Sequence, residues 1–201
     1  PAERTHAMET EQYEVVVVGG GIAGVCAALA AARQECTTVL LQDRPMLGGN
    51  SSGEIGVLVE GGDEMGRYRH SRETGLIDEL FARNVAFPNP VQSPSVWSLV
   101  LWEACREKPN LTVHLNTAAK TPVLEGNRIV ALHAQQHTTE RNAVIHGQIF
   151  VDCSGDARIG YEAGADFMVG REARTEFGEA LASETADTMT MGNTIYIRAR
   201  D

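Results

Sequence analysis

Residues 15–50 constrain the fold of this chain more than any other stretch. A β-branched run, VVVV at residues 15–18, precedes a glycine-rich turn and an alanine-rich segment without proline at residues 22–34. A second apolar run follows and ends at residues 41–43. This order predicts a buried strand, a tight turn, a helix packed on a sheet, and a second strand. Together these elements are half of a nucleotide-binding unit.

The glycines of the turn have the spacing G-x-G-x-x-G, formed by Gly19, Gly21 and Gly24. In this pattern the first glycine permits the turn, the second lets a diphosphate approach the backbone, and the third allows close packing of helix and strand. The helix N-terminus then presents unpaired N–H groups to the diphosphate. The pattern alone is weak evidence, but the strand before it and the helix after it are the confirming context. We therefore predict dinucleotide binding at this turn.

The residue that contacts the adenosine ribose stands at the end of the second strand and is usually Asp or Glu, about twenty residues beyond the glycines. The count favours Gln42, whose amide both donates and accepts hydrogen bonds, with Asp43 as the alternative one residue later. Gln42 therefore departs from the acidic pattern. Arg44 follows closely enough to stack on adenine or to contact a phosphate.

A loop rich in glycine and serine follows at residues 44–62. Glycine lets phosphates pass close to the backbone, so we expect Gly49 to line the site, with Asn50, Ser51 and Ser52 as hydrogen-bond donors. A flexible surface loop is the alternative.

A dense cationic and aromatic group, EMGRYRH, follows at residues 64–70. It is suited to an anionic or hydroxyl-rich substrate, although a solvated stretch before a helix is the more common outcome. Glu54, Arg67 and His70 are the weak candidates for catalytic groups on the substrate side.

The middle of the chain alternates helical and extended patterns. Apolar residues repeat with helical period at residues 74–84, and Pro88, Pro90 and Pro94 end that helix. Ser95 is a plausible cap for the next helix. Its apolar stripe, which we assign to the core, consists of Trp97, Val100, Leu101 and Ala104. Alternation at residues 111–115 predicts a third parallel strand.

Three strand-like runs follow in place of a helix, at residues 121–124, 128–134 and 143–147. Gly126 and Asn127 are suited to the tight turn between the first two runs. Residues 148–152 then read as a fourth parallel strand, closed by the turn CSGD and a helix that runs to Ala163. The fold class is therefore α/β, a Rossmann-like parallel sheet with a β-meander crossover.

Composition and charge exclude several function classes. The chain has 201 residues, 43% of them hydrophobic, and a net charge of -10 without a basic cluster, so we expect no nucleic-acid partner. The four cysteines have no metal-binding or redox spacing, and His133 and His137 would lie about 13 Å apart on a strand, so we expect no metal site. The sequence shows no signal peptide, membrane span or hydrolase motif, and the compartment stays open.

Several segments carry a family resemblance: VVVVGGGIAGVCAALAAARQ, VLLQDRPMLGGNSSGE, RETG, DCSGD and TMGNT. Together they resemble the FAD-dependent oxidoreductase family of the glutathione-reductase-like flavoprotein superfamily, which has the FAD/NAD(P)-binding fold. The resemblance implies FAD rather than NAD as cofactor. It implies that the three glycines contact the pyrophosphate, that Gln42 meets the ribose, and that Arg44 and the Ala119 backbone lie near adenine. Gly155 and Asp156 match the family's glycine turn after the meander.

We expect a disordered segment at residues 1–12, an FAD-binding domain at 13–166, and the start of a truncated substrate or cap region at 167–201, with a strand beginning near residues 195–198. The expected function is hydride transfer from a small molecule to flavin, and a carbohydrate-related substrate is an analogy only. The alternative is a noncatalytic flavin- or nucleotide-binding module, completed by a partner chain or a second copy. A third and weaker alternative is an RNA-modifying flavoprotein, against which the negative charge counts.

Overall fold

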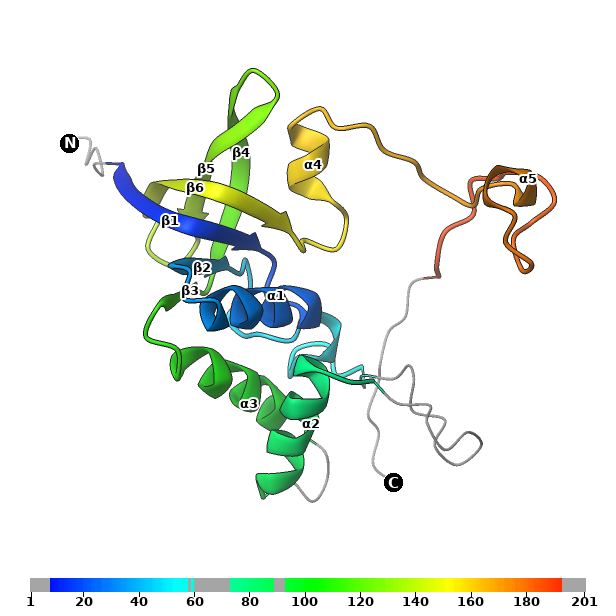
Figure 1. Ribbon diagram of the computed structural model, residues 1–201. Coiled ribbons are helices and arrows are strands. Elements are labelled where there is room, and N and C mark those ends of the chain that lie inside the picture. Colours follow the sequence, from blue (N-terminus) through cyan, green and yellow to red (C-terminus); the bar gives the residue numbers. More distant parts are fainter. Residues whose placement is uncertain (1–7, 58, 60–72, 89–92, 193–201) are drawn as a thin grey trace. The chain divides into compact units, whose positions relative to one another are not determined.

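The computed structural model describes residues 8–57, 59, 73–88 and 93–192 (Figure 1). The chain divides into two compact units, residues 1–163 and 164–201, and each is described by itself. The domain boundary at residue 166 stays a prediction.

The first unit is built on one sheet of six strands in the order β3-β2-β1-β6-β5-β4. The strands β3, β2, β1 and β6 are parallel neighbours, while β6, β5 and β4 form an antiparallel meander. The predicted fold class is thus confirmed. The strand bounds are β1 Glu9–Val18, β2 Thr38–Leu41, β3 Leu111–His114, β4 Thr117–Glu125, β5 Arg128–Gln136 and β6 Asn142–Asp152.

The last strand of the meander and the fourth parallel strand are one continuous strand, β6, whereas the sequence predicts two separate runs that meet at Gly147. The first half of β6 pairs with β5 on one side and β1 on the other, and its second half continues along β1. Gly147 does not break the strand. It allows a close approach, because a Cβ atom there would lie 2.7 Å from Cγ2 of Val16. The predicted turn at Gly126 and Asn127 is confirmed, since Glu125 pairs with Arg128.

The strand β1 begins at Glu9, so residues 9–12 are not the disordered segment that the sequence predicts. They pair with residues 143–146 of β6. Residues 9–12 are polar, so a hydrophobic pattern does not predict a strand there. Backbone hydrogen bonds to β6 hold them in the sheet.

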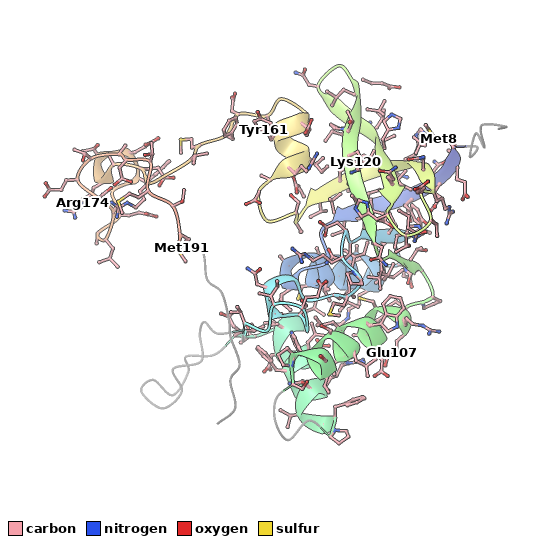
Figure 2. The ribbon with its side chains drawn as sticks, turned by 180° about the vertical axis from the view of Figure 1, so that it is seen from behind. Met8, Glu107, Lys120, Tyr161, Arg174 and Met191 are labelled. Carbon is pink, nitrogen blue, oxygen red and sulfur yellow. The ribbon has the colours of Figure 1, made fainter. Side chains whose placement is uncertain are left out.

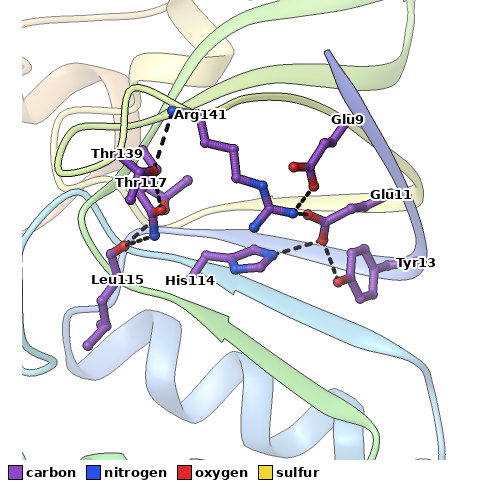
Figure 3. Close-up of polar contacts among 9 residues, drawn as sticks. Glu9, Glu11, Tyr13, His114, Leu115, Thr117, Thr139 and Arg141 are labelled. Carbon is purple, nitrogen blue, oxygen red and sulfur yellow. Dashed lines mark hydrogen bonds and ion pairs between the residues drawn. The ribbon is translucent and has the colours of Figure 1, made fainter. Parts of the chain in front are cut away.

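A polar cluster fastens this first half of β1 to other strands (Figure 3). The Glu11 carboxylate accepts a hydrogen bond from the Tyr13 hydroxyl at 2.7 Å and lies 2.8 Å from Nε2 of His114 at the end of β3. Arg141, in the turn before β6, pairs with Glu9 and Glu11. Burial raises the pKa of Glu11, but the hydrogen bonds from His114 and Tyr13 and the nearby positive charges outweigh it, so the net pKa is below its usual range.

The core lies on both faces of the parallel strands. Val15 and Val17 point to the face covered by helices, while Val16 and Val18 point to the face that packs against the meander. All four side chains are buried, as the VVVV run predicts. Helices α1 Ile22–Arg33 and α3 Pro94–Arg106 therefore cover one face of the parallel strands (Figure 1). The meander, which continues the same sheet, packs against the other face.

The helices match their predicted positions with one correction at a helix start. The helix expected at residues 74–84 is α2 Leu76–Ala86, and the helix expected to end at Ala163 is α4 Arg158–Glu162, with Ala163 as its C-cap. Ser95 is not the cap of α3. Ser93 is the N-cap and Pro94 opens the helix, because proline lacks the N–H that a first helical residue leaves unpaired.

The apolar stripe of α3 is confirmed as core, since Trp97, Val100, Leu101 and Ala104 are all buried. In the described part of the chain, no helix has both the length and the apolar character needed to cross a membrane.

The second unit contains the short helix α5 Arg174–Phe177 and two isolated β-bridges. Arg171 and Asp187 pair through both backbone and side chains. Large apolar side chains of this unit are exposed, among them Phe177 and Leu181. Met191, labelled in Figure 2, is another. The strand predicted near residues 195–198 lies outside the described residues.

Candidate functional site

A cleft of about 1110 Å³ opens where the parallel strands β1, β2 and β6 end. In open α/β sheets this carboxyl edge is where ligands bind. The volume lies above the range of about 300–1,000 Å³ that holds a drug-sized molecule. The cleft is lined by residues 18–23, 41–44, 48–51, 55, 57, 59, 117–119, 153–156, 158, 161 and 162. Most of the cofactor-binding residues predicted from the sequence are in this set. The exceptions are Gly24 and the buried Ser52.

The three glycines of the turn have different surroundings. Gly19 has φ +100°, and a Cβ atom there would lie 2.2 Å from the carbonyl oxygen of Cys153. At Gly24 a Cβ atom would lie 1.8 Å from the carbonyl oxygen of Gly19. At Gly21, the N-cap of α1, it would meet nothing within 4 Å. Gly19 and Gly24 therefore serve packing, whereas Gly21 keeps a part of the cleft open.

The first part of the loop after β2 is fastened to this turn, so residues 47–51 are not a flexible surface segment. The Gly48 N–H donates to the Gly20 carbonyl at 2.8 Å, and a Cβ atom on Gly49 would lie 3.2 Å from Cα of Gly21. The helix α3 holds the loop from the other side, because Ser98 donates to the Leu47 carbonyl at 2.8 Å.

The Ser51 hydroxyl is part of the same fastening. It donates to the Gly48 carbonyl at 2.8 Å and accepts from Nε1 of Trp97 at 3.0 Å. Ser51 is thus committed to the protein, although we predict it as a donor to the cofactor. Asn50 beside it is exposed and lines the cleft.

The two candidates for the ribose contact differ in their surroundings. Gln42 is only 3% exposed, its Oε1 accepts from the Gly20 N–H at 2.8 Å, and its Nε2 donates to the Met46 carbonyl at 3.1 Å. Asp43 is exposed on the rim of the cleft and has no hydrogen-bond or ionic partner among the described residues.

Arg44 lines the cleft and forms an ion pair with Glu54, with 3.5 Å between Nη1 and Oε2. Glu54 itself does not line the cleft. Backbone hydrogen bonds from Asn116 to Arg44 and from Thr117 to Gln42 bring β4 against the end of β2. Ala119, the residue expected beside adenine, lies two residues further along β4 and lines the cleft.

The turn after the meander contributes Gly155, with φ +91°, and Asp156 to the opposite side of the cleft. This turn is held by Asp152, which sequence reasoning missed. Its carboxylate accepts from the backbone N–H groups of Ser154 at 3.0 Å, Ile159 at 2.8 Å and Gly160 at 3.0 Å. Burial raises the pKa of Asp152, but these hydrogen bonds and one from the Ser154 side chain outweigh it, so the net pKa is lowered. The available signal was an acidic residue at a strand end, directly before a turn and a helix.

The substrate side is less completely described. Arg67 and His70 lie outside the described residues, so their roles stay predictions, as does that of Glu54. In the part of the chain that the structure describes, no three His, Cys, Asp or Glu side chains gather where they could hold a metal ion.

Comparison with known proteins decides the family. The family model described as FAD dependent oxidoreductase matches residues 14–199. The chain belongs to this family. The resemblance seen in the glycine turn and the GGNSS loop is thereby confirmed, and so is FAD as the cofactor.

Two relatives show how much of a longer protein this chain matches. It is 26% identical over 192 residues to the tRNA uridine 5-carboxymethylaminomethyl modification enzyme of Wolinella succinogenes, covering 85% of this chain and 29% of that protein. It is 37% identical over 90 residues to the glycerol-3-phosphate dehydrogenase of Mycobacterium leprae, covering 43% of this chain and 15% of that protein. The chain thus spans less than a third of the length of either relative.

A solved structure shares the fold of this chain. A geranylgeranyl bacteriochlorophyll reductase-like protein from Thermoplasma acidophilum superposes with a TM-score of 0.57 and 16% identity, covering 78% of this chain and 43% of that one. At this identity the likeness concerns the fold alone.

Proposed function

We propose that the chain binds FAD in the cleft and serves as an FAD-dependent oxidoreductase, or as the FAD-binding portion of one, acting on a small molecule. The observation that carries the proposal is the opening at Gly21, where a Cβ atom would enter the cleft without meeting the protein. The N-terminal end of α1 supplies unpaired N–H groups at the same point. A diphosphate fits both features.

The residues at the two ends of the cleft fit the two halves of FAD. Asp43, Arg44 and Ala119 surround the end beside β2 and β4, which suits an adenosine. The backbone of Gly49 and the turn at Gly155 and Asp156 flank the glycine turn, which suits the diphosphate and the sugar-alcohol chain. Gln42, Asn50 and Ser51 also line the cleft. Gln42 directly follows β2, and Asn50 and Ser51 belong to the loop after it.

When bound, the isoalloxazine ring supplies the hydride acceptor. The chain's own residues would hold and orient the cofactor, and Ile55, Val57 and Val59 contribute apolar side chains to the lining of the cleft. We propose a small-molecule substrate, with a carbohydrate-related compound as the analogy drawn from the sequence. Glu54, Arg67 and His70 remain the proposed substrate-side groups.

The test is an absorption spectrum of the purified chain, followed by titration with FAD. We expect a bound yellow chromophore or saturable FAD binding. The variant Gly21→Ala should fold normally, because φ at Gly21 is -66°. It should lose most FAD affinity, because the new methyl group would occupy the place where the diphosphate approaches the backbone. The matched control is Gly192→Ala, whose Cβ also meets nothing within 4 Å but which does not line the cleft. A protein that is colourless and has no affinity for FAD would refute the proposal.

A second candidate is a noncatalytic flavin-binding module, completed by a second copy or by a partner chain. The apolar side chains of the second unit favour it, because Leu181 and Met191 are not covered by the unit that contains them, and a partner chain or a second copy would bury them. Gel filtration with mass measurement tests this candidate: a dimer or a copurifying polypeptide supports it, and a stable monomer that turns over substrate rules it out.

We propose that nucleic acid is not a partner. The name of the Wolinella succinogenes relative refers to tRNA uridine, but this chain has a net charge of -10, which repels phosphates. Electrophoretic mobility of labelled tRNA at low salt would reveal an interaction if there were one.

A further inference from the structure

Gln42 makes hydrogen bonds to four segments at the carboxyl edge of the sheet. Its backbone N–H donates to the His114 carbonyl at 2.9 Å, and its carbonyl accepts from the Thr117 N–H at 2.7 Å. Its side chain accepts from Gly20 and donates to the Met46 carbonyl. Both polar atoms of the side chain are therefore engaged in holding the glycine turn and the loop after β2 at a fixed separation.

The packing around Gln42 leaves its side chain little freedom. A Cβ atom on Gly20 would lie 2.9 Å from Cβ of Gln42 and 2.7 Å from Cδ2 of Leu47, so the turn sits directly on this side chain. Gln42 is almost fully buried, whereas Asp43 is exposed on the rim of the same cleft.

The hydrogen-bond pattern requires an amide at this position. The Gly20 N–H needs an acceptor and the Met46 carbonyl needs a donor, and glutamine supplies one of each. An ionised glutamate only accepts hydrogen bonds, so it would place a buried carboxylate oxygen against the Met46 carbonyl oxygen. Two acceptors facing each other without a proton leave both unsatisfied.

We propose that Gln42 is a positioning residue, which holds the glycine turn against the loop at residues 46–52, and that Asp43 makes the contact to the ribose hydroxyls. This assignment rests on the proposed binding of FAD in the cleft. With this assignment the site keeps an acidic side chain directly after the end of β2, where an acidic residue usually contacts the ribose. The Asp43 side chain is exposed on the rim of the cleft.

The variant Gln42→Glu separates this assignment from a direct ribose contact, because the two predict opposite results. A direct ligand should tolerate glutamate or bind FAD more tightly with it, since an acidic residue is the usual partner of a ribose hydroxyl. If Gln42 is a positioning residue, glutamate at this position should weaken FAD binding. We expect FAD affinity to fall about tenfold at about pH 8, the effect of one buried hydrogen bond lost.

The affinity of Gln42→Glu should recover as the pH falls toward about 5, because a buried glutamic acid has a raised pKa and regains a donor when it is protonated. The wild-type chain, measured in parallel, should not show this recovery. A general loss of structure would not produce a pH-dependent rescue. Circular dichroism at each pH confirms that the compared proteins are folded.

A second measurement leaves Gln42 untouched. The probes are FAD and its analogue that lacks the 2′-hydroxyl of the adenosine ribose. The wild-type chain should bind FAD about tenfold more tightly than the analogue, and Asp43→Ala should bind both equally, because the partner of that hydroxyl is gone.

The inference is overturned if Gln42→Glu binds FAD as tightly as wild type at both pH values, or if Asp43→Ala still distinguishes FAD from the analogue. If instead the wild-type chain binds no FAD, it is the proposed function that fails.

Discussion

Nε1 of Trp97 donates a hydrogen bond to the Ser51 hydroxyl oxygen at 3.0 Å. Because Ser51 in turn donates to the Gly48 carbonyl and Gly48 to that of Gly20, this contact connects the middle of α3 to the glycine turn. The geometry of the cleft therefore depends on a buried tryptophan of the helical layer as well as on the glycines.

Replacing Trp97 by phenylalanine removes this donor and keeps an aromatic ring beside Phe81, with which Trp97 stacks at 5.5 Å between ring centroids. We expect a loss of about 1 kcal/mol in the free energy of unfolding and a several-fold rise in the Kd for FAD, because the loop loses one anchor. Urea denaturation and FAD titration measure the two effects. Trp102→Phe, on the same helix, is the control and should leave the Kd unchanged.

Substitutions at two glycines of the turn should have different effects: one should reduce the free energy of unfolding, and the other should reduce FAD binding alone. Gly24→Ala brings a methyl group within 1.8 Å of the Gly19 carbonyl oxygen, so the helix must move from the strand. We expect a loss of about 3 kcal/mol or more in the free energy of unfolding. Gly21→Ala should leave unfolding in urea within about 0.5 kcal/mol of wild type. Equal destabilisation of the two variants would contradict the different roles assigned to these glycines.

Glu11 should make the stability of the first unit sensitive to acid. Its folded pKa lies below the unfolded value, so the carboxylate favours folding above the unfolded pKa, and this contribution is lost as the pH falls through the folded pKa. Glu11→Gln should therefore be less stable than wild type by up to about 1 kcal/mol near neutral pH, and equal to it in acid.

Thermal unfolding of both proteins across the acid range measures this difference. The groups that face Glu11 are Glu9, Tyr13, His114 and Arg141, and Glu9→Gln serves as a control on the same strand. A difference between wild type and Glu11→Gln that persists unchanged into acid would argue against the charge of Glu11 as its cause.

Asp152 should control the turn that carries Gly155. Asp152→Asn keeps the size of the side chain but removes the charge that accepts three backbone N–H groups. We expect a several-fold loss of FAD affinity and a loss of about 1 kcal/mol in the free energy of unfolding, because the turn loses a charged acceptor. The loss stays this small because the carboxylate is partly exposed to solvent. FAD titration of Asp152→Asn beside Asp166→Asn, an acidic change outside the cleft, measures the effect. Identical FAD affinities of the two variants would show that the turn at Gly155 keeps its geometry without the Asp152 carboxylate.

The meander connects two parallel strands, and its side chains should also contribute to the hydrophobic core. Leu132 on β5 is 0% exposed and packs in the layer that includes Val16 and Val18, whereas Leu124 on the neighbouring strand is 42% exposed. Leu132→Ala should cost about 2–5 kcal/mol, and Leu124→Ala less than about 1 kcal/mol. Denaturant titration of both variants is the measurement. Similar costs would mean that the meander does not pack as described.

The sequence by itself determined the features that are local. The VVVV run, the glycine spacing and the alanine-rich helix form one continuous signal, because strand, turn and helix are set by neighbouring residues. The same holds for the turn at Gly126 and Asn127 and for the apolar stripe of α3. The family, the α/β fold and FAD as cofactor followed from these segments.

The tertiary structure alone decided how those segments meet. The strand at residues 9–12 could not be predicted from hydrophobicity, because these residues are polar and their partner strand β6 lies more than a hundred residues away in the sequence. The role of Gln42 depends on where the Gly20 N–H and the Met46 carbonyl come to lie, which no count along the chain reveals. Asp152 went unnoticed for the same reason. Spacing can name the residues near a ligand, but only packing fixes which hydrogen-bonding groups are already used by the protein and which remain for the ligand.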